Sequence, residues 1–166
     1  MMLSTKVAST LNDQVNHEFS NAFTYLAAAA WFAEKNLTGF AHWMKIQHSE
    51  EMNHAHKLFE FILDRGGKVS LDTIEKPAED YGTTKDVFAS ALKLEQETTA
   101  RINRLYALAV QEGDFATQSH LKWYVDEQVE EEKNVAEILA KLAMAGDSKG
   151  TLLMLDHQMG KRAKAQ

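Results

Sequence analysis

Four stretches of this sequence place an apolar residue at every third or fourth position, and glutamate interrupts each run near its middle. The runs are Val7, Leu11, Val15, Glu18, Ala22, Tyr25, Ala29, Phe32; Phe40, Met44, Gln47, Glu51, His54, Leu58, Phe61; Phe88, Ala91, Glu95, Thr98, Ile102, Leu105, Ala109; and Leu121, Tyr124, Gln128, Glu131, Val135, Ile138, Leu142. Such steps keep each run on one face of an α-helix, the face that a soluble protein buries. The pattern predicts four amphipathic helices that carry glutamate into a shared core.

Glutamates in a core need a positive partner. Burying an unpaired carboxylate costs on the order of several kcal/mol, and no Lys or Arg occurs in the four runs. A bound cation would supply the missing charge. The acidic interruptions therefore predict a dinuclear iron site inside a four-helix bundle.

The composition predicts a single all-α domain over residues 1–166, with the bundle at about 4–145. The chain has one proline, Pro77, and its eight glycines cluster between the runs, so long stretches are free of helix breakers. Acidic residues outnumber basic ones by 24 to 18, which disfavours nucleic acid as a partner and suits the attraction of cations. No cysteine is present, so disulfides and iron–sulfur clusters are excluded. No signal peptide or membrane-spanning stretch is visible, and we expect a cytoplasmic protein with no membrane partner.

The connection over residues 66–82 decides the topology. Helices of about 28 residues are roughly 42 Å long, and an antiparallel neighbour needs a connection of only about 2–8 residues. A connection of this length could stretch to about 55 Å, so we expect the second and third helices to run parallel. We expect Thr38 and Asp114 to cap the second and fourth helices, and Thr83 with Asp86 to form a capping box for the third.

Glu51 and His54 form a Glu-x-x-His pair, whose spacing lets both side chains bind one ion. Alone this signal is weak, but the pair lies within an apolar run. Glu18, Glu95 and Glu131 each interrupt the apolar face of a different helix. Any one of them could face solvent if the buried face of its helix were assigned wrongly. For all of them to face solvent, every one of these assignments would have to be wrong. Oxygen-rich ligation with one imidazole suits iron or manganese better than structural zinc.

Four segments resemble those of bacterial non-haem ferritins, and the resemblance covers essentially the whole chain. They are residues 16–20 (NHEFS), 50–54 (EEMNH), 94–96 (LEQ) and 123–131 (WYVDEQVEE). The resemblance implies a ferritin-like four-helix bundle with a long crossover between the second and third helices and a short C-terminal fifth helix at about 150–159. It also implies a ferroxidase that oxidises Fe(II) with dioxygen or hydrogen peroxide and stores ferric oxide in a shell of twenty-four subunits.

Specific iron ligands are carried over by motif. They are Glu18, Glu51 and His54 for the first iron; Glu51, Glu95 and Glu131, with Gln128 close by, for the second; and Glu50, Glu127 and Glu130, sharing Glu131, for a third on the inner side. An acidic face in contact with solvent is the alternative for the third set. Tyr25 would hydrogen-bond near the centre and supply an electron, or is an ordinary core tyrosine.

Three alternatives stay open at the level of sequence. A bacterioferritin or another soluble diiron oxidase or peroxidase would hold its irons as a fixed cofactor. Many such proteins carry a second Glu-x-x-His on the fourth helix, where this chain has Gln128, Glu131 and then Asn134. This difference favours iron that passes through the centre toward a mineral over a permanently held cofactor, and no haem is expected. A helical interaction module would bind no metal.

The apolar segment 151–155 (TLLML) would pack around a fourfold axis of the shell, or fold back on its own bundle.

Overall fold

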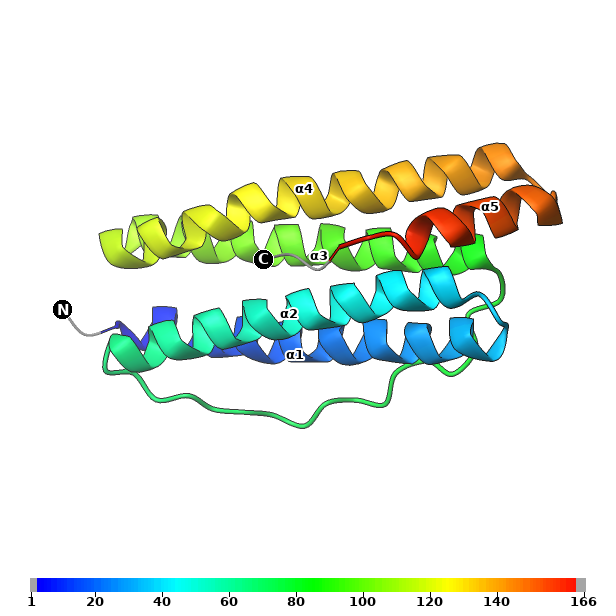
Figure 1. The fold of residues 1–166 in the computed structure, drawn as a ribbon. Helices are drawn as coiled ribbons and strands as arrows, with labels where there is room; N and C mark the ends of the chain where they lie inside the picture. Colours follow the sequence, from blue (N-terminus) through cyan, green and yellow to red (C-terminus); the bar gives the residue numbers. More distant parts are fainter. Residues whose placement is uncertain (1–2, 164–166) are drawn as a thin grey trace.

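The computed structural model describes residues 3–163, and this part of the chain forms five α-helices without strands (Figure 1). The helices are α1 (Thr5–Glu34), α2 (Thr38–Asp64), α3 (Thr84–Gln111), α4 (Phe115–Ala145) and α5 (Lys149–Met159). The predicted all-α bundle with a short C-terminal helix is thereby confirmed. The first two and last three residues of the expected 1–166 domain lie outside the described range.

The four long helices are arranged as two antiparallel hairpins, α1 with α2 and α3 with α4 (Figure 1). The connection between α2 and α3 runs back along the length of the bundle, so these two helices point in the same direction, as predicted. Two side chains of α1 hold the extended connection in place. Asn12 Oδ1 accepts from the Ser70 amide at 2.7 Å, and Asn16 Oδ1 accepts from the Asp72 amide at 2.9 Å.

Most of the predicted helix starts are confirmed. Thr83 and Asp86 form a reciprocal capping box, and Asp114 accepts a hydrogen bond from the backbone N–H of Thr117. Thr38 was assigned wrongly, because it is the first residue of α2 and Leu37 is the N-cap, without a side-chain cap. The burial of the Leu37 side chain, 9% exposed, sets this turn in place of a capping hydroxyl.

The core has two apolar parts with a polar belt between them. One part gathers around Phe32, Phe40 and Phe88, and the other around Leu11, Leu58 and Leu105. All members of the four sequence runs are buried except Phe61, which is half-buried because its neighbour Ile62 takes the core position. Among the described residues, no helix is both long and apolar enough to cross a membrane.

Helix α5 folds back against α2 and α4 of its own chain (Figure 1). The approach is close: a Cβ atom on Gly39 would lie 1.7 Å from the carbonyl oxygen of Asp156, so only glycine fits there. Asp156 Oδ1 accepts from the Phe40 amide at 2.9 Å. Leu153 and Met154 remain 60% and 74% exposed. Helix α5 therefore packs on the bundle of its own chain, which was one of the two alternatives for residues 151–155, and it leaves the apolar side chains of Leu153 and Met154 exposed.

Candidate metal centre

The polar belt contains every first- and second-iron ligand predicted from the sequence. All of these side chains are at most 3% exposed, and they are Glu18 on α1, Glu51 and His54 on α2, Glu95 on α3, and Gln128 and Glu131 on α4. The belt lies between the two hairpins, because three members come from α1 and α2 and three from α3 and α4. The predicted helical phases were therefore correct.

Glu18, Glu51 and His54 form a group ready to bind a cation. Each offers a ligand atom, and these atoms lie within 4.8 Å of one another. Glu18 Oε2, Glu51 Oε1 and His54 Nδ1 are buried without a hydrogen-bond partner outside this group, although Glu18 and Glu51 can share a proton with each other. Buried polar atoms are nearly always paired, so three atoms without an outside partner at a single point make this group a candidate cation site. Two carboxylates and an imidazole are suitable ligands for iron.

Two further side chains of α1, the helix that carries Glu18, donate hydrogen bonds to this group. Gln14 Nε2 donates to Glu18 Oε1 at 2.7 Å, and Asn21 Nδ2 donates to Glu51 Oε2 at 3.3 Å. Asn21 also donates to Thr98 Oγ1 at 3.1 Å. Gln14 and Asn21 were not among the residues predicted from the sequence. Their positions four residues before and three after Glu18 were the available signal, since that spacing places them on the same helix face.

Glu95, Gln128 and Glu131 make up the second half of the belt, and protein donors already occupy it. The Tyr25 hydroxyl donates to Glu95 Oε1, and Gln128 Nε2 donates to Glu95 Oε2 at 3.3 Å. Gln47 Nε2 donates to Glu131 Oε2 at 2.9 Å. Glu95 belongs to neither of the close ligand groups found among the described residues. A second ion here would have to replace some of these hydrogen bonds.

Burial raises the pKa of every carboxyl group of the belt. It raises the pKa of Glu18 to about 7 and that of Glu131 to about 8. Burial, followed by the nearby Glu95 and Glu18, raises the pKa of Glu51 well above its usual range. Burial lowers the pKa of His54 to about 4, so its imidazole is neutral and available as a ligand.

The residues predicted for a third iron are only partly brought together. Glu127 lies with His54 and Glu131 in a second group whose ligand atoms are within 4.8 Å of one another. Glu50 and Glu130 belong to neither group, and Glu130 is exposed. Glu50 instead forms an ion pair with Arg162, 2.7 Å from Nη2 to Oε2. Nothing in the sequence pattern linked Arg162 to this region.

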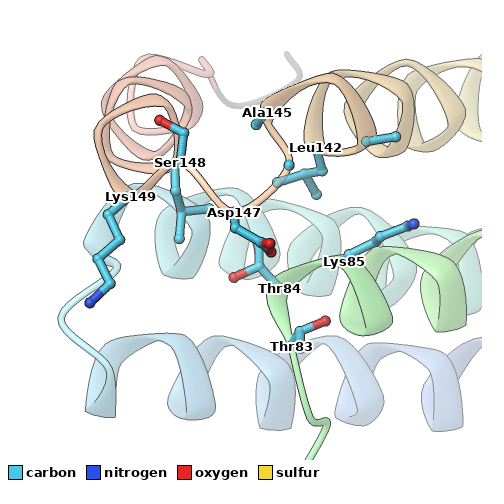
Figure 2. A pocket seen from close by; sticks show the side chains of 11 residues that line it. Thr83, Thr84, Lys85, Leu142, Ala145, Asp147, Ser148 and Lys149 are labelled. Atoms are coloured by element: carbon cyan, nitrogen blue, oxygen red, sulfur yellow. The ribbon is translucent and has the colours of Figure 1, made fainter.

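One hollow lies at an end of the bundle and another along its side. The first, of about 470 Å³, is lined by the start of α3 and the connection from α4 to α5 (Figure 2), and none of the belt residues lines it. The second, of about 410 Å³, lies under the long connection and is lined by Tyr25, Met44 and Tyr81 among others. Tyr25 separates the second hollow from Glu95, to which its hydroxyl donates a hydrogen bond.

Comparison with known proteins agrees with this geometry. The family model described as "Ferritin-like domain" matches residues 8–145. The chain belongs to the ferritin family. It is 36% identical to a bacterial non-heme ferritin of Staphylococcus aureus over 161 residues, 97% of each chain, and 36% identical to a probable bacterial non-heme ferritin-like protein of Haemophilus influenzae over 96% of each. An open-pore ferritin from the archaeon Archaeoglobus fulgidus superposes with a TM-score of 0.96 at 40% identity, covering 97% of this chain and 98% of that one.

These likenesses confirm the predicted resemblance to bacterial non-haem ferritins and the predicted fold. They support iron binding, iron storage and ferroxidase activity as the general function of this ferritin.

Proposed function

We propose that this ferritin is a cytoplasmic ferroxidase that oxidises Fe(II) between its four long helices and stores the ferric product. The observation that carries the proposal is the set of three buried atoms without an outside partner on Glu18, Glu51 and His54. These residues would hold the first Fe(II). Glu51 would be shared with a second Fe(II) held by Glu95 and Glu131, with Gln128 beside it.

The oxidation balances with two irons and one oxidant. Each Fe(II) gives up one electron; dioxygen takes both, with two protons, and leaves as hydrogen peroxide. Hydrogen peroxide as oxidant takes two electrons and two protons and leaves as two waters. The raised pKa values of Glu18 and Glu131 mean that these groups hold protons before iron binds. Ion binding releases those protons at the place where reduction of the oxidant consumes them.

Tyr25 has a place in this scheme through its hydrogen bond to Glu95. Burial raises the pKa of its hydroxyl well above 10, so the side chain is neutral and donates to the carboxylate. It lies between the second-ion half of the belt and the hollow under the long connection. We assign it the positioning of Glu95 and, as a redox-active phenol, the supply of the second electron when only one Fe(II) is bound, with its hydroxyl proton passing to Glu95.

Storage requires an enclosed volume, which we assign to a shell of twenty-four copies. The similarity to a whole ferritin chain and the exposed apolar side chains of α5 support this assembly. Glu50, Glu127 and Glu130 would take iron leaving the centre. Glu50 and Glu127 are partly buried and Glu130 is exposed. Burial raises the pKa of Glu50 and of Glu127, and repulsion between the three glutamates adds to the rise, while Arg162 opposes it at Glu50; this balance suits a transient site.

The test is aerobic titration of the purified metal-free protein with Fe(II), following ferric absorbance and particle size together. We expect fast oxidation that continues beyond two or three irons per chain, with the iron retained in a soluble particle of shell size. Oxidation that stops at two irons per chain would instead favour a fixed diiron cofactor of the oxidase or bacterioferritin kind. Oxidation no faster than in a protein-free control would refute both.

A further inference from the structure

The chain segment after α5 returns to the middle of the bundle and touches α2. Met159 is buried, and the backbone oxygen of Arg162 lies 2.9 Å from His42 Nε2. The hydrogen bond from the Phe40 amide to Asp156 adds a third point of attachment, on α5 itself. The position of the Arg162 side chain is therefore set by α5 and not by a free tail.

The Arg162 guanidinium makes three contacts on α2. Nη2 donates to Glu50 Oε2 at 2.7 Å, Nη1 donates to Gln47 Oε1 at 2.5 Å, and the group lies 4.6 Å from the centre of the Trp43 ring. Both partners of the ion pair are largely covered, with the side chains of Arg162 and Glu50 20% and 12% exposed. This geometry differs from that of a solvated surface pair, which would leave both groups free to move.

Gln47 extends the contact into the metal centre. While its oxygen accepts from Arg162, its Nε2 donates to Glu131 Oε2 at 2.9 Å. The Arg162 guanidinium is thus linked to Glu131, a predicted ligand of the second ion, through Gln47 alone, and it contacts Glu50 directly. Arg162 sits where the belt meets the acidic residues of the predicted third site.

We propose that Arg162 is a tethered counter-ion that competes with a metal ion for Glu50 and so limits how many ions each chain retains. The inference rests on the proposed function, because it takes Glu50 as a ligand for outgoing iron. A divalent ion and a guanidinium on the same carboxylate repel each other at short range. An ion can therefore bind Glu50 firmly only when Arg162 moves away, and α5 or the segment after it moves with it.

The competition is reciprocal, since an ion that weakens the docking of Arg162 must itself be bound more weakly while Arg162 is docked. A purely structural Arg162 would show no such link. In that case its loss would loosen the end of α5 and leave the affinity for metal unchanged.

The experiment uses Zn²⁺, which binds without oxidation, on the assembled metal-free protein. Calorimetric titration compares the unchanged protein with Arg162→Gln and with Lys161→Gln, a control that removes the same charge from the exposed neighbouring residue. We expect Arg162→Gln to tighten the weakest ion by about tenfold, within the usual range for coupled sites. Lys161→Gln should leave it unchanged. Equal ion number and affinity in all three proteins would overturn the proposal.

Hydrogen exchange gives a readout independent of affinity. In the unchanged protein, the peptide covering residues 155–163 should exchange faster once the weakest ion is bound, and Glu50→Gln should abolish that response. Unaltered exchange at full loading would also overturn the proposal. A failure of the proposed function would be distinguishable from a failure of this proposal. If the unchanged protein does not oxidise Fe(II), the ferroxidase assignment is refuted, while the Zn²⁺ results still decide the role of Arg162.

Discussion

The two halves of the belt differ in how their polar atoms are satisfied. Around Glu18, Glu51 and His54, three buried atoms have no hydrogen-bond partner outside their own group. Around Glu95 and Glu131, the hydroxyl of Tyr25 and the amides of Gln128 and Gln47 donate to the carboxylates. An unpaired buried group is destabilising until something binds it, whereas a hydrogen bond must be broken before an ion replaces it. Under the proposed function, we therefore expect the first ion to bind more tightly than the second.

The largest effect should come from Glu51→Gln, because this residue would be shared by both ions. We expect the rate of Fe(II) oxidation to fall by more than the ~10–100-fold typical of losing an outer partner of a metal ligand. The metal-free protein should unfold at an equal or higher temperature, because one buried acidic group is removed from a cluster of them. Stopped-flow absorbance and calorimetry measure the two effects. Normal oxidation with a markedly lower unfolding temperature would contradict the assignment.

A matched pair of variants compares the halves directly. His54→Gln removes a ligand from the first half, and Gln128→Met removes a donor from the second at similar volume. We expect His54→Gln to weaken the first Zn²⁺ by at least about 10–100-fold and Gln128→Met to leave it unchanged while altering the second. Isothermal titration calorimetry separates the two ions. If Gln128→Met weakens the first ion as much as His54→Gln does, the asymmetry between the halves is refuted.

The pH dependence follows from the raised pKa values of Glu18, about 7, and Glu131, about 8. In the unfolded chain these groups ionise near pH 4.5, so between there and pH 8 the folded state binds more protons. Stability of the metal-free protein should therefore fall as the pH rises. The lowered pKa of His54 acts in the opposite direction, but only below about pH 6.5.

The clean window is thus pH 6.5 to 8, and urea unfolding across it tests the sign. Over the same window Zn²⁺ affinity should rise by up to about tenfold per pH unit for each proton displaced. Stability that increases with pH in this window would show that Glu18 and Glu131 are already ionised in the folded protein.

The smallest effect should come from Tyr25→Phe, which makes the second half resemble the first. Loss of the hydroxyl leaves Glu95 Oε1 without its donor, and we expect the metal-free protein to lose about 1–3 kcal/mol of stability. The second Zn²⁺ should bind more tightly, because one hydrogen bond no longer competes with it. Tyr106→Phe, at a half-buried tyrosine packed on the other apolar part, is the control. Equal losses in both variants would deny Tyr25 its role at Glu95.

The sequence was sufficient for the fold and for the membership of the belt, because both follow from helical period. Glu18 and Glu131 interrupt apolar runs, and the length of the connection over 66–82 fixes the crossover. Helical periodicity cannot show which buried groups form hydrogen bonds with each other. The bonds from Tyr25 to Glu95 and from Gln47 to Glu131 join different helices, so they depend on packing.

Contacts between distant parts of the chain were beyond prediction for the same reason. Arg162 reaches Glu50 only because Gly39 lets α5 come close to α2, and no spacing along the sequence records that approach. The start of α2 failed for a related cause. Thr38 has the chemistry of an N-cap, but the burial of Leu37 decided where the helix begins.

The belt also lies on the seam between the two hairpins, and this placement bears on how long the protein survives in a cell. Ions shared by Glu51 on one hairpin with Glu95 and Glu131 on the other would join the two halves, and a ligand that binds only the folded chain stabilises it in proportion to its concentration. Proteases act on the opened population. Under the proposed function, iron-starved copies would be degraded faster than loaded ones, so that turnover matches storage capacity to the supply of iron.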